Sequence, residues 1–198
     1  MKKIGWLGLF ALLVCVNSLQ AEVEQIEIRW NAFKCLDTCV PLIQRNLLAI
    51  KHVTNLQINA RSGTAVMGWN PNYPFTYEPF KLASSAAGIH IDDVRIRVRG
   101  TIAHDGDNFY LVSDGDDARF LLIGPLRPEP GRYIPNYSLV NRPLSGTVKE
   151  QLLEAEKNQF TVVISGPLYL PRRYPRTLIT EQIKVNVKES QKDSRFQR

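Results

Sequence analysis

The sequence predicts an α+β protein built from two small units, the first with four strands and two helices and the second a small β-barrel. Three observations support this prediction. In the first half of the chain, apolar residues alternate as in strands in some segments and recur at helical spacing in others. From Gly100 onwards, short strand-like segments are separated by Asp-Gly turns of the hairpin type. The apolar content of 44% is that of a folded globular protein.

The first unit occupies residues 22–99 and opens with a strand in which apolar and polar residues alternate. Pro41 is tolerated because it falls in the first turn of the next helix. A turn at Gly63 joins two strands into a hairpin, and Gly88 ends the second helix. The expected elements are a strand at 23–30, a helix at 40–50, strands at 53–60 and 64–69, a helix at 75–87 and a strand at 89–98. This order, β-α-β-β-α-β, is the ferredoxin-like plan.

The second unit occupies residues 100–188 and is expected to hold three strands, a helix and two further strands. The strands are expected at 101–104, 108–112, 118–123, 160–166 and 178–187, and the helix at 147–158. In a closed or nearly closed sheet this pattern is typical of an OB-like barrel. The polar tail, residues 189–198, is expected to be disordered. No flexible linker separates the units, so the strand before Gly100 should continue across it and couple them rigidly.

The first residues have the parts of a secretory signal peptide. A short positive segment, Met1-Lys2-Lys3, precedes an apolar run from Ile4 to Val16, and we place cleavage after the small residue Ala21. The run is too short to cross a bilayer, which takes roughly 20 apolar residues. We therefore expect residues 1–21 to be removed and the mature chain to be exported, periplasmic or secreted, soluble and without a membrane span.

The charge of the chain does not by itself indicate a nucleic-acid partner. The formal net charge of +6 falls to +4 once Lys2 and Lys3 are removed with the signal. The excess is modest and scattered, apart from Arg95, Arg97 and Arg99 and a cluster of Arg172, Arg173 and Arg176. The first three alternate along a strand, as on a solvated face. We also expect no enzymatic activity, because the sequence has no Gly-x-Ser-x-Gly, paired-His metal motif or phosphate-binding Gly loop.

The first unit has a loop with two cysteines between its first strand and first helix, then a hairpin, then a second helix that ends at Ala87-Gly88. With these features it resembles a heavy-metal-associated domain, the fold of copper chaperones and of the periplasmic mercury-binding protein. The run from Val66 to Pro71 also sits where that family has its third strand and an Asp-Pro or Asn-Pro exit. The resemblance covers residues of about 24–99 and implies a soft-metal site at the two-cysteine loop.

The cysteine loop departs from the motif of that family in two ways. Phe33 stands where the family has a methionine two residues before the first cysteine. Three residues, rather than two, separate Cys35 from Cys39, which gives CxxxC. One extra loop residue is easily absorbed, so the implied fold is unchanged. By position, Cys35 and Cys39 are the only residues that could inherit the role of metal ligands.

Cys35 and Cys39 are the only cysteines of the mature chain, because Cys15 lies in the signal peptide. Three interpretations of the pair stay open. Thiolates are the ligands that Cu(I), Hg(II) or Zn prefer, and the first turn of a helix favours the thiolate of Cys39. In an oxidising compartment the pair could instead form a structural disulfide. It could also be a redox-active pair.

The favoured hypothesis from sequence is an exported carrier or sensor in which Cys35 and Cys39 hold Cu(I) or another soft metal ion and exchange it with a metal-handling protein. The alternative is an envelope protein–protein interaction module in which the cysteines form a structural disulfide. The stretch 167–176, rich in Tyr, Pro and Arg, would then be a contact surface, because Tyr and Arg are enriched in protein interfaces.

Overall fold

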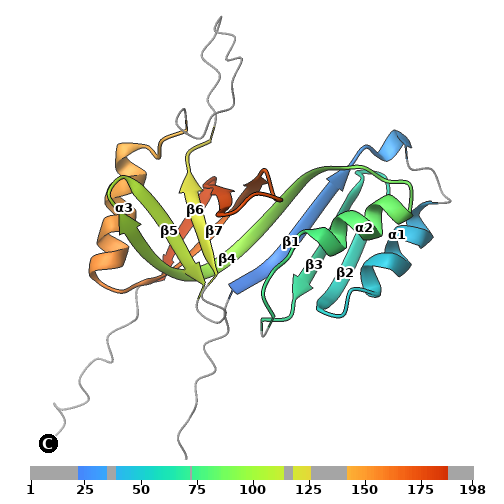
Figure 1. The fold of residues 1–198 in the computed structure, drawn as a ribbon, viewed down its shortest axis with the longest axis horizontal. Coiled ribbons are helices and arrows are strands. Elements are labelled where there is room, and N and C mark those ends of the chain that lie inside the picture. Colours follow the sequence, from blue (N-terminus) through green and yellow to red (C-terminus); the bar gives the residue numbers. More distant parts are fainter. Residues whose placement is uncertain (1–21, 35–38, 72, 114–117, 126–141, 187–198) are drawn as a thin grey trace, which may run out of the picture.

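The computed structural model describes residues 22–34, 39–71, 73–113, 118–125 and 142–186 (Figure 1). The strands in these ranges are β1 (Glu22–Trp30), β2 (Val53–Asn59), β3 (Thr64–Trp69), β4 (Ile91–Asp105), β5 (Asn108–Ser113), β6 (Arg119–Ile123), β7 (Thr161–Tyr169), β8 (Arg176–Ile179) and β9 (Gln182–Asn186). The helices are α1 (Cys39–Leu48), α2 (Glu78–Ala86) and α3 (Gly146–Lys157), with the short 3-10 helix η1 (Ala32–Lys34) after β1. No helix among the described residues is long and apolar enough to span a membrane.

The described strands all belong to one nine-stranded sheet, in the order β2-β3-β1-β4-β5-β6-β8-β7-β9. An additional pairing of β4 with β7 closes β4, β5, β6, β8 and β7 into a five-stranded barrel. Within this sheet β6 and β8 pair in parallel, and the other neighbours pair antiparallel. Strands β1, β2 and β3 extend from the barrel as an open sheet, and α1 and α2 lie across one face of it (Figure 1). Helix α3 packs on the barrel with Leu152 and Ala155 buried.

Strand β4 connects the open sheet to the barrel. It pairs with β1 along residues 91–99, with β7 along 95–100 and with β5 along 100–105. Gly100 lies where the partner changes, and a Cβ atom there would come within 2.1 Å of the carbonyl oxygen of Val112. Only glycine tolerates so close an approach of two backbones. The predicted continuity of this strand across Gly100 is confirmed.

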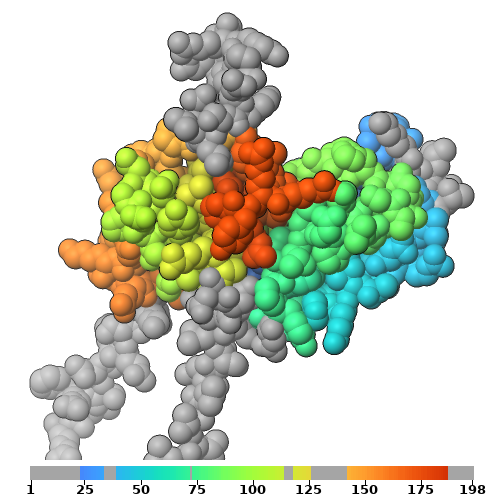
Figure 2. Space-filling view, viewed as in Figure 1, coloured from blue at the N-terminus to red at the C-terminus, as the bar shows by residue number. Residues whose placement is uncertain are grey.

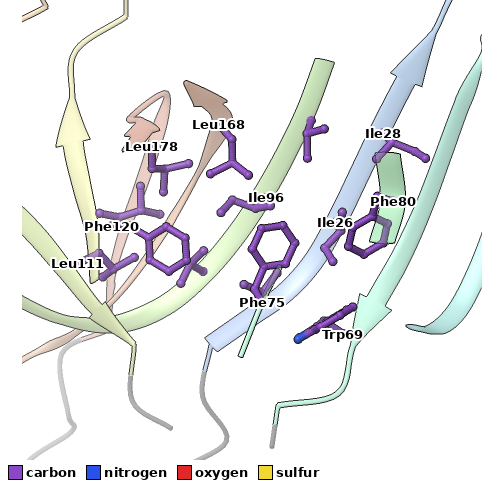
Figure 3. Close-up of a cluster of buried hydrophobic side chains, with 14 of the residues drawn as sticks. Ile26, Ile28, Trp69, Phe75, Phe80, Ile96, Leu111, Phe120, Leu168 and Leu178 are labelled. Atoms are coloured by element: carbon purple, nitrogen blue, oxygen red, sulfur yellow. The ribbon is translucent and has the colours of Figure 1, made fainter. Parts of the chain in front are cut away.

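One hydrophobic core runs through both parts of the molecule (Figure 3). Ile26 of β1 and Phe80 of α2 are fully buried in the open-sheet part, and Phe120 and Leu178 are fully buried in the barrel. Phe75 lies between these two groups, so the core is not interrupted at the boundary between them (Figure 3). Because buried side chains are close-packed, the open sheet and the barrel are held in one fixed relative position.

The predicted fold class, a ferredoxin-like α+β module followed by a separate OB-like barrel, is wrong. The elements expected in residues 22–99 occur in the expected order, but they do not form a module of their own. Their last strand, β4, is also a barrel strand, and the protein is mostly β with a closed five-stranded barrel and three helices in the described residues. Hydrophobic periodicity identifies a strand but not its partners, and the β4–β7 pairing that joins the parts is a long-range contact.

The strand expected at residues 178–187 is two strands, β8 and β9. At the interruption, the backbone of Gly166 comes very close to that of Ile179. A Cβ atom on Gly166 would lie 1.8 Å from the carbonyl oxygen of Ile179. At the break, the Thr180 amide donates to the Ile123 carbonyl (2.8 Å) and the Glu181 amide to the Ser165 carbonyl (3.2 Å). The expected signal peptide and the expected disordered tail lie outside the described residues.

Candidate functional site

Of the two cysteines predicted as metal ligands, the structure describes only Cys39. It is the first residue of α1, half-buried against the core, and it is disulfide-bonded. Cys35 lies outside the described residues. A disulfide sulfur is not a thiolate, so in this state Cys39 does not fit a soft metal ion. Within the described part of the chain, no group of three or more His, Cys, Asp and Glu side chains could hold a metal.

The alternating arginines of β4 are held in ion pairs on the side of the strand that faces away from the core. Arg97 and Arg99 donate through their Nε atoms to the two carboxylate oxygens of Glu24, at 2.8 and 2.6 Å. Arg95 pairs with Asp93 (3.5 Å) and with Glu181. These arginines therefore form a cross-strand charge network and do not present a free cationic face.

The candidate functional site is a groove between α2 and the turn that joins β7 to β8, residues 170–175. Two adjoining cavities of about 440 and 400 Å³ form it, and we call them the first and second cavities of the junction groove. Both cavities are lined by Tyr77, Lys81, Pro171, Arg172 and Arg173. The first is also lined by Ser85, Ile89, His90, Ile91 and Leu170, and the second by Thr76, Glu78, Tyr174 and Arg176. Figure 2 shows the orange-red β7–β8 segment meeting the green surface around α2.

Helix α2 supplies one wall of the junction groove. One face of the helix packs on the sheet, and another side of it lines the groove. Phe80 and Ala83 are buried on the inner face and fix the helix on the sheet. Tyr77, Lys81 and Ser85 are each four residues apart, a spacing that places them in a row on one side of a helix. That row is the α2 wall of the groove, and Pro79 is accommodated because it falls in the first turn.

The β7–β8 turn supplies the other wall and is attached to both parts of the molecule. The Arg173 amide donates to the Leu170 carbonyl at 2.8 Å, and the Tyr174–Pro175 peptide bond is cis. At the end of the turn, the guanidinium of Arg176 lies 5.9 Å from the ring of Phe75 and 6.0 Å from the ring of Phe120. These separations are within the range of cation–π contacts. Arg176 thus lies within cation–π distance of one ring from the barrel, Phe120, and of Phe75 at the boundary with the open sheet.

Positive charge exceeds negative charge in the groove. The described residues that line the first cavity include Lys81, Arg172 and Arg173 and no acidic residue. Glu78, in the second cavity, lies 3.6 Å from Lys81 Nζ and 3.8 Å from Arg172 Nε. Arg173 forms no ion pair with any residue that the structure describes. Because the single carboxylate of Glu78 pairs with both Lys81 and Arg172, and Arg173 has no ion pair among the described residues, the groove keeps an excess of positive charge.

The floor of the first cavity is apolar and contains one phenol. Ile89 is buried, while Tyr77 and Ile91 are half-buried. Burial raises the pKa of the Tyr77 hydroxyl, and the nearby charge of Arg172 lowers it by less. The hydroxyl is therefore neutral near pH 7 and can donate a hydrogen bond to a ligand. Next to this cavity, Tyr174 is 85% exposed.

No protein family, curated protein or solved structure matches this chain. The resemblance of residues of about 24–99 to a heavy-metal-associated domain therefore stays a prediction.

Sequence reasoning identified one wall of this groove and missed the other. The stretch 167–176 was expected to be a protein-contact surface, and its residues 170–174 and 176 line the groove. The α2 row of Tyr77, Lys81 and Ser85 was not recognised. Its four-residue spacing was a usable signal, but nothing in the sequence indicated that α2 faces a turn more than 80 residues further along the chain.

Proposed function

We propose that this protein is an exported binding module that recognises a protein partner through the junction groove. The observation that carries the proposal is the composition of the groove, an apolar floor beside cations that are only partly neutralised. Tyr and Arg side chains such as Tyr174, Arg172 and Arg173 are the types enriched where binding energy concentrates in protein interfaces. Cavities of this size are also typical of specific ligand sites.

The frame of the groove supports the same proposal. Its walls come from α2 and from the turn between β7 and β8, and the helix and both strands contribute residues to one core. Arg176 lies within cation–π distance of Phe120 in the barrel and of Phe75 at the boundary with the open sheet. A groove with walls that are already fixed loses little conformational entropy when a partner binds.

The soft-metal hypothesis stays a separate prediction. Because Cys39 is disulfide-bonded, metal binding through Cys35 and Cys39 would first require reduction. The test is a thiol count on the mature protein followed by titration of the reduced form with Cu(I) against a competing chelator. One tightly held ion per chain, lost in a variant with Cys35→Ser and Cys39→Ser, would support metal handling. No competitive Cu(I) affinity after reduction would exclude it.

The test of the proposed function is site-specific photocrosslinking in the envelope of the native host. A photoreactive phenylalanine analogue replaces Tyr174, and in a matched control it replaces Leu153, an exposed residue of α3. We expect a discrete adduct from position 174 that is absent from position 153. The adduct should be lost when Arg172→Glu and Arg173→Glu are added, and retained when the exposed cations Arg61→Glu and Lys184→Glu are changed instead. Equal adduct patterns from both positions, or an adduct insensitive to Arg172 and Arg173, would overturn the proposal.

A further inference from the structure

The lining of the first cavity of the junction groove is mostly apolar, and its cationic side chains carry hydrogen-bond donors only. Lys81, Arg172 and Arg173 carry N–H donors and no side-chain acceptor, and the Tyr77 and Ser85 hydroxyls can also donate. No carboxylate lines this cavity within the described part of the chain. The group that best matches several convergent donors, two of them guanidinium groups, is a carboxylate of the ligand.

An apolar surface lies within the same cavity, beside these donors. It is formed by Ile89, Ile91, Leu170 and Pro171. A ligand that fills the cavity must therefore present a carboxylate and an apolar group only a few ångströms apart. The last residue of a polypeptide does so when its side chain is apolar, because its terminal carboxylate and its side chain are attached to the same Cα atom.

We propose that the first cavity of the junction groove binds the carboxy-terminal residue of the partner protein, with an apolar side chain against Ile89 and Leu170 and the terminal carboxylate on Arg172 and Arg173. This inference rests on the proposed function and specifies the part of the partner that is recognised. The preceding residues of the partner lie along the second cavity, beside Thr76 and Tyr174.

The second cavity favours a peptide over a fatty acid, the other common ligand that joins a carboxylate to an apolar body. It continues the groove and adds the polar and charged side chains of Thr76, Glu78 and Arg176 to a lining that also includes Pro171 and Tyr174. An acyl chain longer than the first cavity would cover these polar groups and leave them without hydrogen-bond partners. A peptide main chain, with its N–H and C=O groups, can pair with such a lining.

Glu78 limits how many carboxylates the groove accepts. It lies between Lys81 and Arg172 and partly satisfies both, whereas Arg173 has no ion pair among the described residues. A second ligand carboxylate beside Glu78 would meet a like charge. The groove is therefore suited to one terminal carboxylate and not to a strongly acidic segment.

The experiment uses the mature full chain and two peptide libraries. Both are octapeptides randomised at the last four positions, one with free and one with amidated carboxy termini. We expect selected peptides to end in an apolar residue, and amidation of a selected peptide to weaken its binding at least about tenfold, since a charge-assisted contact is lost. In Arg173→Gln the difference between free and amidated peptides should shrink, while the control Arg61→Gln should keep it. Circular dichroism checks that each variant is folded.

The outcomes separate this inference from the proposed function. Groove-dependent binding of free and amidated peptides alike would overturn terminal recognition and leave protein binding in place. Absence of peptide binding in both libraries, together with absence of the crosslink from position 174, would overturn both. Binding of dansylated fatty acid that is lost in Arg173→Gln, with no peptide bound, would identify a lipid ligand and also overturn the inference.

Discussion

The two arginine-rich regions of this protein carry similar side chains but differ in the charge that remains available to a ligand. On β4, Arg97 and Arg99 share the carboxylate of Glu24, and Arg95 is paired with Asp93 and Glu181. In the junction groove, Glu78 is the one acidic side chain among the described residues that line either cavity. The comparison shows that the neighbouring acidic side chains, and not the number of arginines, decide how many cations of a basic cluster are without an ion pair among the described residues.

The local structure of β1 explains how one acid, Glu24, pairs with two of the β4 arginines, and Asp93 and Glu181 beside Arg95 bring the acids of this network to the same number as its arginines. The register between β1 and β4 shifts between Val23 and Gln25, so Glu24 lies at an irregularity of the strand. From this position its two carboxylate oxygens reach Arg97 and Arg99 separately. Of the two arginines in the β7–β8 turn, Arg172 pairs with Glu78 of α2, and Arg173 has no acidic partner among the residues that the structure describes.

The largest expected effect is on partner binding, from charge reversal in the groove. Arg172→Glu with Arg173→Glu should weaken binding of a selected peptide about a hundredfold, because attraction to a carboxylate becomes repulsion. Isothermal titration calorimetry measures the loss. Thermal unfolding should change little, since both side chains are exposed.

The matched variant for this comparison changes the other arginine region. Arg97→Ala with Arg99→Ala should leave peptide binding within about twofold of the wild type. Both side chains are hydrogen-bonded to Glu24, and neither lines the two cavities of the junction groove. If this variant lost binding as strongly as the groove variant, the distinction between neutralised and available arginines would be wrong.

The second prediction concerns the contribution of the Glu24 ion pairs to stability. Glu24→Gln removes the negative charge that pairs with Arg97 and Arg99, and should lower the free energy of unfolding by about 1 kcal/mol. The effect should shrink at about 1 M salt, because exposed ion pairs are screened there. Urea unfolding at low and high salt measures it, with Glu150→Gln on the exposed face of α3 as control. A salt-independent loss would indicate altered packing and not lost charge pairing.

The positions of the helices and strands were predictable from the sequence. The way in which the strands pair with one another was not. Alternation placed β1, β3 and β5, and helical spacing placed α1 and α3, within a few residues of where they occur. The pairing of β4 with β7 was not predictable, because a strand buried on one face has the same alternation whether its second edge is free or paired. The split of β8 from β9 depends on the close approach at Gly166, which is also a long-range contact.

The candidate site was predictable only in part for the same reason. The Tyr, Pro and Arg composition of residues 167–176 indicated a contact surface, because those residue types favour interfaces wherever they are exposed. The cavity required a second wall, and only the shared core places α2 opposite the turn. The cysteine pair was the clearest chemical signal in the sequence, yet Cys39 is disulfide-bonded and half-buried at the start of α1.

The third prediction tests whether the cation–π contacts of Arg176 couple the two parts of the molecule. Arg176→Lys keeps the charge but loses the planar guanidinium that lies 5.9 Å from the ring of Phe75 and 6.0 Å from that of Phe120, and should lower the free energy of unfolding by about 0.5 kcal/mol. In a double-mutant cycle with Phe75→Leu, the effect of Arg176→Lys should become smaller. If the effects of Arg176→Lys and Phe75→Leu in thermal unfolding were additive, the contact between Arg176 and Phe75 would contribute no coupling.

The smallest expected effect is a change in the titration of Tyr77. Burial raises the pKa of Tyr77 above its ordinary value of 10.0 and Arg172 opposes this, so Arg172→Ala should raise that pKa further. The control Arg99→Ala should leave it unchanged. Tyrosinate absorbance, taken as the difference between each protein and its Tyr77→Phe variant, measures the shift.

The raised pKa of Tyr77 also determines how the stability of the protein changes with pH. Because the pKa of Tyr77 is higher in the folded than in the unfolded protein, its contribution to stability is complete below about pH 10 and is lost as the pH rises through the folded-state pKa. Wild type should therefore lose stability across this alkaline range more steeply than Tyr77→Phe in urea unfolding. If the two proteins lost stability in parallel, the Tyr77 hydroxyl would not be desolvated, and the first cavity would lack the neutral donor assigned to it.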